Sequence, residues 1–134
     1  MPPLRTLIVE DYEQFRNFLR FTLQKEAQCI VIGEAVDGLQ AVQQAEELQP
    51  DLILLDLSLP KLNGMEAFRR IRKLSPHSKL VILSQDSSRE VVQEALRLGA
   101  VGYLLKSDAT ELPLVLDAIL QGGVFVSPRL KISR

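Results

Sequence analysis

Short apolar runs alternate with helical patterns along the chain. The apolar runs span residues 4–9, 29–33, 52–55, 80–83 and 101–105. Between them, apolar residues recur at steps of three and four, the spacing of an amphipathic helix. The run at 52–55 has no polar residue, as expected for a central strand covered by helices on both faces. The alternation is typical of βα units around a parallel sheet and predicts an α/β fold.

Single residues mark where some helices begin and end. Asp37 is a suitable N-cap for a helix over residues 38–48, with Gln40 three residues later and Pro50 just beyond the last turn. Gly99 is expected to end the fourth helix as its C′ residue. The helices should bury the following stripes: Phe15, Phe18, Leu19 and Leu23; Phe68, Ile71 and Leu74; Val91, Ala95 and Leu98.

The last helix should begin at Thr110, because Pro113 then falls in the first turn, where no intrahelical N–H bond is needed. The glycine pair at 122–123 should end it. Residues 124–130 are too apolar for a floppy tail, and their Ser-Pro pair at 127–128 suits the first positions of another helix.

Composition indicates one compact domain. The chain has 134 residues, of which 46% are apolar, so it can bury a core without a metal or disulfide. A net charge of −1 gives no general attraction to nucleic acid or anionic membrane. The single cysteine, Cys29, excludes an intrachain disulfide, and no apolar run approaches the roughly 18 residues of a membrane span. We therefore expect a soluble cytoplasmic protein without a membrane segment.

Reactive side chains follow the predicted strands directly. They are Glu10 and Asp11 after the first strand, Asp56 after the third, Ser84 after the fourth and Lys106 after the fifth. In an open parallel sheet the carboxyl ends of the strands form the ligand site, so these groups should converge at one rim. Taken singly, the acidic pair could serve a helix N-terminus and the lysine could be an ordinary surface residue.

Three neighbouring carboxylates repel one another and need a cation or shifted pKa values. Oxygen ligands favour Mg²⁺, or Mn²⁺, whereas no Cys/His cluster supports zinc. With Lys106 beside them, they make a phosphoryl-transfer site in which Asp56 is the nucleophile and the product is an aspartyl phosphate. This hypothesis requires the oxygens to lie close together and Asp56 to be reachable from solvent.

These residues resemble the response regulator receiver domain of two-component systems, over about residues 4 to 121. The resemblance implies a flavodoxin-like (βα)5 doubly wound parallel sheet with strand order 2-1-3-4-5. It implies that Asp56 is the phosphoacceptor within an acidic pocket of Glu10, Asp11 and Asp56. Magnesium would then be bound by Asp11, Asp56 and the backbone carbonyl of Ser58, and by Glu10 through water.

The resemblance also assigns the residues that would respond to the phosphoryl group. Ser84 matches the hydroxyl switch residue, Lys106 the phosphoryl-binding lysine and Tyr103 the aromatic switch, although a half-buried strand tyrosine is equally common. Ser58 and Asp86 match positions that influence dephosphorylation. Lys106 is followed by Ser107 where the family commonly has proline, so we expect a trans peptide there.

Phrases at 11–16, 102–108 and 123–128 are similar to the LuxR/NarL-type transcription regulators. This resemblance implies a receiver domain over residues 1–121 and, over 122–134, the start of a linker to an absent helix-turn-helix effector. The implied partners are a sensor histidine kinase, a second copy on phosphorylation, and DNA through the absent domain only. The domain would be a signalling module that catalyses only its own phosphorylation and dephosphorylation.

Other functions remain open at this point. A stand-alone receiver, acting in phosphotransfer or protein interaction, is the main alternative. An aspartate-nucleophile phosphatase of the haloacid dehalogenase type would need a second Asp where the chain has Ser58. A flavodoxin-like cofactor binder would need a glycine-rich phosphate loop, which no strand is followed by. A receiver-like scaffold that takes no phosphate would usually have lost one of the acidic or lysine positions.

Overall fold

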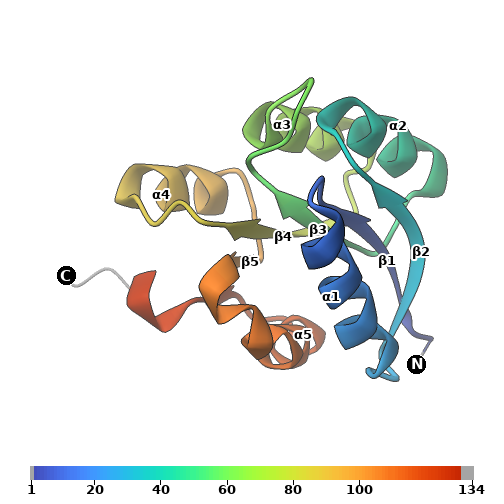
Figure 1. The fold of residues 1–134 in the computed structure, drawn as a ribbon, viewed down its shortest axis with the longest axis vertical. Coiled ribbons are helices and arrows are strands. Elements are labelled where there is room, and N and C mark those ends of the chain that lie inside the picture. Colours follow the sequence, from blue (N-terminus) through green and yellow to red (C-terminus); the bar gives the residue numbers. More distant parts are fainter. Residues whose placement is uncertain (1, 131–134) are drawn as a thin grey trace.

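A six-stranded parallel sheet forms the centre of the molecule, in a computed structural model that describes residues 2–130 (Figure 1). The strands are β1 (Leu4–Val9), β2 (Cys29–Ala35), β3 (Leu52–Asp56), β4 (Lys79–Ser84), β5 (Gly102–Leu105) and β6 (Phe125–Val126). Their order is β2-β1-β3-β4-β5-β6, so the predicted order of five strands is confirmed and a short sixth strand is added at the β5 edge.

Helices cover both faces of the sheet (Figure 1). They are α1 (Glu13–Gln24), α2 (Gly38–Leu48), α3 (Gly64–Leu74), α4 (Arg89–Arg97) and α5 (Leu112–Leu120). Two separate apolar cores result: one joins the sheet to α2, α3 and α4, and the other joins it to α1 and α5. Alternate residues of β3 supply them, with Ile53 in the first core and Leu54 in the second.

The helix α2 begins and ends as predicted. The Asp37 side chain accepts a hydrogen bond from the Gln40 backbone N–H at 2.8 Å, which satisfies one free donor of the first turn. At the other end Gln49 adopts a left-handed conformation with φ of 47°, and Pro50 follows. Gly99 has φ of 103° after α4, in agreement with its expected place past that helix.

Some predicted details were wrong. Leu74 and Phe18 are each 37% exposed, because they lie at the margins of the buried stripes of α3 and α1. In α4, Val92 is buried and was missed, whereas the predicted Ala95 is buried and Val91 and Leu98 pack, partly buried, against the same core. The last helix does not begin at Thr110: the chain first forms a 3₁₀ helix, η1 (Lys106–Glu111), with a kink at Asp108, and α5 follows with Pro113 in its first turn.

The segment after α5 folds back onto the sheet. Strand β6 pairs in parallel with β5, and a single 3₁₀ turn, η2 (Pro128–Leu130), comes next. The Ser-Pro pair therefore does start a helical turn, and residues 131–134 lie outside the described residues. Within the described range, no helix is long and apolar enough to cross a membrane.

Candidate functional site

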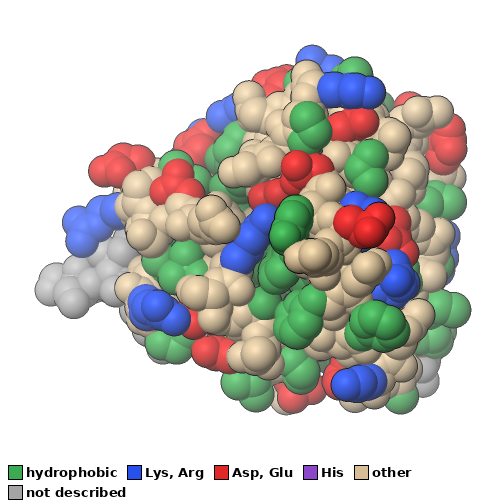
Figure 2. All heavy atoms as spheres, in the orientation of Figure 1, with side chains coloured by type: hydrophobic (Ala, Val, Ile, Leu, Met, Phe, Trp, Pro, Cys, Tyr) green, Lys and Arg blue, Asp and Glu red, His purple; other side chains and the backbone are tan. Residues whose placement is uncertain are grey.

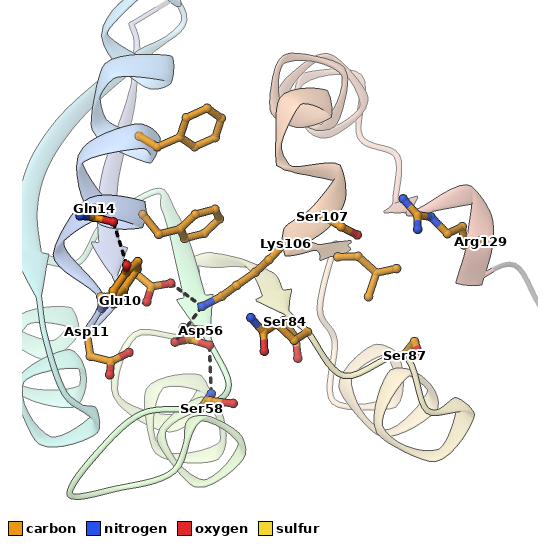
Figure 3. Close-up of a pocket in the computed structure, with 15 residues that line it drawn as sticks. Glu10, Asp11, Gln14, Asp56, Ser58, Ser84, Ser87, Lys106, Ser107 and Arg129 are labelled. Atoms are coloured by element: carbon orange, nitrogen blue, oxygen red, sulfur yellow. Dashed lines mark hydrogen bonds and ion pairs between the residues drawn. The ribbon is translucent and has the colours of Figure 1, made fainter.

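The predicted site residues meet at the carboxyl ends of the central strands (Figure 3). Glu10 and Asp11 follow β1, Asp56 is the last residue of β3, Ser84 ends β4, and Lys106 follows β5. All five line one open cleft of about 1030 Å³. Figure 2 shows acidic and basic side chains beside hydrophobic ones near the middle of this face.

The three carboxylates lie close together. Glu10, Asp11 and Asp56 can each offer one oxygen such that these atoms all lie within 4.8 Å of one another. Glu10 and Asp56 are buried, whereas Asp11 is exposed to the cleft. Clustered carboxylate oxygens are the ligands that hard divalent cations prefer. The donor set therefore fits a divalent cation that enters from the side of Asp11.

Lys106 bridges the two buried carboxylates. Its Nζ lies 2.9 Å from Glu10 Oε1 and 3.3 Å from Asp56 Oδ2. Its ammonium also lies 5.0 Å from the centre of the Phe15 ring, within the range of a cation–π contact. Burial alone would lower the pKa of Lys106, but the close contact with Glu10 and the charge of Asp56 outweigh burial and raise it.

Burial disfavours the charged form of Glu10. Its side chain is only 1% exposed, and burial raises the pKa of this carboxyl although Lys106 and the Tyr12 backbone N–H both bind it. Glu10 Oε1 and Asp56 Oδ2 are fully buried without a hydrogen bond of ordinary geometry, so their contact with Lys106 compensates them only in part. A bound cation next to these oxygens would stabilise the negative charge of both carboxylates.

Asp56 is held by the loop that follows β3. Its Oδ1 accepts a hydrogen bond from the Ser58 backbone N–H at 3.0 Å. The residue is only 2% exposed, with its Oδ2 3.3 Å from the Lys106 Nζ, and it lines the cleft. The oxygens are therefore close, as the hypothesis requires, and Asp56 lines the open cleft although little of its surface is exposed.

Gly64 allows this loop to approach the start of α3. A Cβ atom on Gly64 would lie 2.4 Å from Leu57 Cα and 2.6 Å from the Asp56 carbonyl oxygen, closer than van der Waals contact allows. The Gly64 N–H donates to the Leu57 carbonyl oxygen at 2.9 Å. The close contact thus fixes the backbone on which Asp56 and Ser58 are carried.

Ser84, Asp86 and Tyr103 form a linked group beside the acidic cluster. The Ser84 Oγ accepts from the Asp86 N–H at 2.9 Å, and the Tyr103 hydroxyl donates to the Asp86 carbonyl oxygen at 2.6 Å. Tyr103 is fully buried, and this burial raises its pKa. The Asp86 side chain is turned instead toward the start of α4, where it accepts from the Ser88 N–H at 2.8 Å. Asp86 therefore contributes its backbone to this group.

Phe15 and Arg129 are among the cleft residues that the sequence analysis did not place in the site. Phe15 was expected only to pack on the sheet, but its ring lies beside Lys106 and stacks with Phe18 at 5.8 Å. Arg129 also lines the cleft, from the turn η2. Nothing local in the sequence indicates its place, since β6 must first pair with β5 to bring it there.

Comparison with known proteins agrees with this geometry. The family model described as "Response regulator receiver domain" matches residues 6–117. The transcriptional regulatory protein DegU of Brevibacillus brevis is 34% identical over 128 residues, which are 95% of this chain and 54% of DegU. The chemotaxis protein CheY of Thermotoga maritima is 35% identical over 102 residues, 76% of this chain and 84% of CheY.

A solved structure gives the same result. A two-component response regulator of the LuxR family from Aurantimonas sp. superimposes with a TM-score of 0.88 at 31% identity, covering 96% of this chain and 92% of that one. The chain spans about half the length of DegU, so it corresponds to one part of that relative. Sequence, fold and site agree, and the chain belongs to the response regulator receiver domain family of two-component signalling proteins.

Proposed function

We propose that Asp56 accepts a phosphoryl group from a phosphohistidine of a sensor histidine kinase, and that the acyl phosphate switches the domain between two states. The observation that carries the proposal is the meeting of three carboxylates and Lys106 at one rim of the sheet. The receiver would catalyse only its own phosphorylation and dephosphorylation, so it is a signalling domain and not an enzyme with a separate substrate.

The chemical step can be assigned to atoms of this chain. An Asp56 oxygen attacks phosphorus, the P–N bond of the phosphohistidine breaks, and the imidazole nitrogen leaves with the electron pair. Lys106 lies 3.3 Å from Asp56 Oδ2, so a short movement would place its ammonium against an oxygen of the transferred group. Its charge would then stabilise the phosphoryl oxygens as it now stabilises the carboxylates.

We propose Mg²⁺, or Mn²⁺, as the cation of the acidic cluster. Asp11, Asp56 and the Ser58 backbone carbonyl would hold it directly and Glu10 would act through water. When bound, it would neutralise charge on the transferring group. Exposed Asp11 and buried Glu10 fit these different roles, since Asp11 is open to the cleft whereas Glu10 is buried against Lys106.

The switch would use groups that already contact one another. We propose that Ser84 exchanges its hydrogen bond from the Asp86 N–H for one to a phosphoryl oxygen. Tyr103 would respond because it binds the carbonyl of the same Asp86. The change would alter the face formed by α4, β5 and α5, provided that the phosphoryl group contacts one state better than the other. Ser58 and Asp86 are proposed to modulate dephosphorylation.

The output is proposed to be transcription through a DNA-binding domain beyond residues 1–121. This proposal rests on DegU, a transcriptional regulatory protein of which the matched region is 54%. Residues 122–134 would begin the linker, although Phe125–Val126 already pair with the sheet. Homodimerisation on phosphorylation and a cytoplasmic location complete the proposal. A stand-alone receiver is the second candidate, because the match covers 84% of CheY.

One experiment tests the phosphoacceptor. The protein and its Asp56→Asn variant are incubated with acetyl phosphate and Mg²⁺, and intact mass is recorded. The parent should gain one phosphoryl mass and Asp56→Asn none, while Asp117→Asn on the exposed side of α5 should behave as the parent. Equal gains in the parent and in Asp56→Asn, or none in either, would refute the assignment.

A further inference from the structure

The backbone around Lys106 is attached to the C-terminal segment Phe125–Leu130 on both sides. One residue before the lysine, the Leu105 N–H donates to the Ser127 Oγ at 3.0 Å. Two residues after it, Asp108 Oδ1 accepts from the Arg129 guanidinium at 2.5 Å. Lys106, which bridges Glu10 and Asp56, therefore lies between two residues that the C-terminal segment holds in place, Leu105 and Asp108.

The Ser127 hydroxyl adds one hydrogen bond to those between β5 and β6, at the point where the main-chain hydrogen bonds end. Phe125 and Ser127 donate their N–H groups to Val101 and Tyr103 at 3.0 Å each. Beyond that point the Leu105 N–H is buried, and the Ser127 side chain is the acceptor that satisfies it. Ser127 has no exposed surface, so water cannot replace this hydrogen bond.

The Arg129–Asp108 pair fixes the other side of the turn. Asp108 is only 8% exposed and lies at the kink of η1, with φ of −107° and ψ of 19°. Its Oδ2 is buried without a hydrogen bond, which leaves the Arg129 guanidinium as the cation that compensates this carboxylate within the described residues. Leu130 then enters the core that also contains Leu105 and Tyr103.

We propose that Ser127 and Arg129 are positioning residues for Lys106. Ser107 follows the lysine, so no proline ring restricts the backbone there, and the contacts of Ser127 and Arg129 would hold this turn instead. The proposal rests on the proposed function, since its consequence is the placement of the Lys106 ammonium against the phosphoryl group. It gives the C-terminal segment a role in the reaction itself.

The test compares two properties of Ser127→Ala, Ser127→Thr and Arg129→Ala in the full chain. The first is the rate of phosphorylation by acetyl phosphate with Mg²⁺, and the second is Mg²⁺ affinity by calorimetric titration. Ser127→Ala and Arg129→Ala should each slow phosphorylation about 3- to 10-fold, the effect of one hydrogen bond on an equilibrium. Ser127→Thr keeps a hydroxyl and should retain most of the rate.

The Mg²⁺ affinity distinguishes a misplaced Lys106 side chain from a general disruption of the site. In the proposed function Lys106 would contact the phosphoryl group and not the cation, so its misplacement should not lower Mg²⁺ affinity. Arg97→Ala is the matched control: Arg97 is similarly exposed, 69% against 63% for Arg129, and is paired with Glu94 at 2.7 Å, but it does not line the cleft. It should phosphorylate as the parent does.

Double variants with Lys106→Met test whether Ser127 and Arg129 act through the lysine. In a Lys106→Met background, Ser127→Ala and Arg129→Ala should change the residual rate no further, because the group they position is gone. Additive losses in that background, or parallel falls in rate and Mg²⁺ affinity, would overturn the proposal. If the parent itself gains no phosphoryl group, the proposed function fails instead, so the two failures are distinguishable.

Discussion

Lys106 compensates the negative charge of the two buried carboxylates, Glu10 and Asp56. It is 17% exposed and contacts two carboxylates whose own side chains are 1% and 2% exposed. Such a buried arrangement is strongly destabilised when one partner is removed, because an uncompensated charge remains. At the same time, a cation bound by the carboxylates and the ammonium of Lys106 repel each other. Lys106 should thus stabilise the fold and weaken cation binding.

Replacing Lys106 by methionine should separate these effects. We expect Lys106→Met to lower the free energy of unfolding by about 3 kcal/mol, the scale for breaking a buried ion pair. Mg²⁺ should bind more tightly, since its competitor is absent, while phosphorylation by acetyl phosphate should slow. Urea unfolding and calorimetric titration measure the first two quantities. Weaker Mg²⁺ binding by Lys106→Met would contradict the assigned competition.

The stability of the parent should also depend on alkaline pH through this lysine. Its pKa is raised above the ordinary 10.5, so its ion pairs stabilise the fold fully below that pH and lose this effect as pH rises through the folded value. Unfolding measured from about pH 9 to 12 should show a steeper decline for the parent than for Lys106→Met. Tyr103 titrates in both proteins and cancels in the difference.

Sequence reasoning located the reactive residues but not their contacts. Glu10, Asp11, Asp56 and Lys106 could be found because each directly follows an apolar run, and strand ends converge in a parallel sheet. The hydrogen bond from Tyr103 to the Asp86 carbonyl involves loop backbone, whose path side-chain patterns do not encode. The contacts of Ser127 and Arg129 span 22 and 21 residues and leave no local signal.

Elements were predictable where the chain marks their ends or buries an unbroken stripe. Asp37 and Pro50 bracket α2, and β3 has no polar residue before Asp56. The 3₁₀ helix η1 was missed because the position of Pro113 indicated an α-helical start at Thr110. The chain instead first forms a 3₁₀ helix with a kink at Asp108. Strand β6 was missed because two residues are too few to show alternation.

The junction of β3 and α3 offers a prediction at the scale of elements. Gly64→Ala should destabilise the protein by about 1–3 kcal/mol, because the added methyl group would meet backbone atoms that cannot rotate away. Mg²⁺ affinity should fall as well, since the displaced loop carries Asp56 and Ser58. Gly123→Ala is the comparison: its Cβ would lie 3.3 Å from the Ala118 carbonyl oxygen, a milder contact, so a smaller loss is expected. Unfolding and Mg²⁺ titration of Gly64→Ala that match the parent would rule out this role for Gly64.

For the whole molecule, the cation should act as a stabilising ligand. The acidic cluster joins residues after β1 to the end of β3, and a cation bound there favours the folded chain over the unfolded one. At a concentration of 100 times its Kd, Mg²⁺ should add about 2.7 kcal/mol to the free energy of unfolding. Thermal unfolding with Mg²⁺ and with EDTA measures the gain.

The same melting experiment has an internal control. Asp11→Asn removes the exposed carboxylate of the cluster and should abolish most of the gain from Mg²⁺, whereas Asp117→Asn on α5 should keep it. If Asp11→Asn and the parent are protected equally, the cation binds elsewhere and the assigned ligands are wrong.

The pairing of β6 with β5 has a consequence for how the protein can associate. Exposed strand edges invite strands from other chains, which add to a sheet through main-chain hydrogen bonds with little regard for sequence. Here the flank of β5 is already occupied by residues 125–126, so the described sheet ends in β2 on one side and in the two-residue strand β6 on the other. On this side β6 offers main-chain partners over two residues, so a molecule that docks there must depend mostly on side chains. Such contacts are selective and can be adjusted by single substitutions.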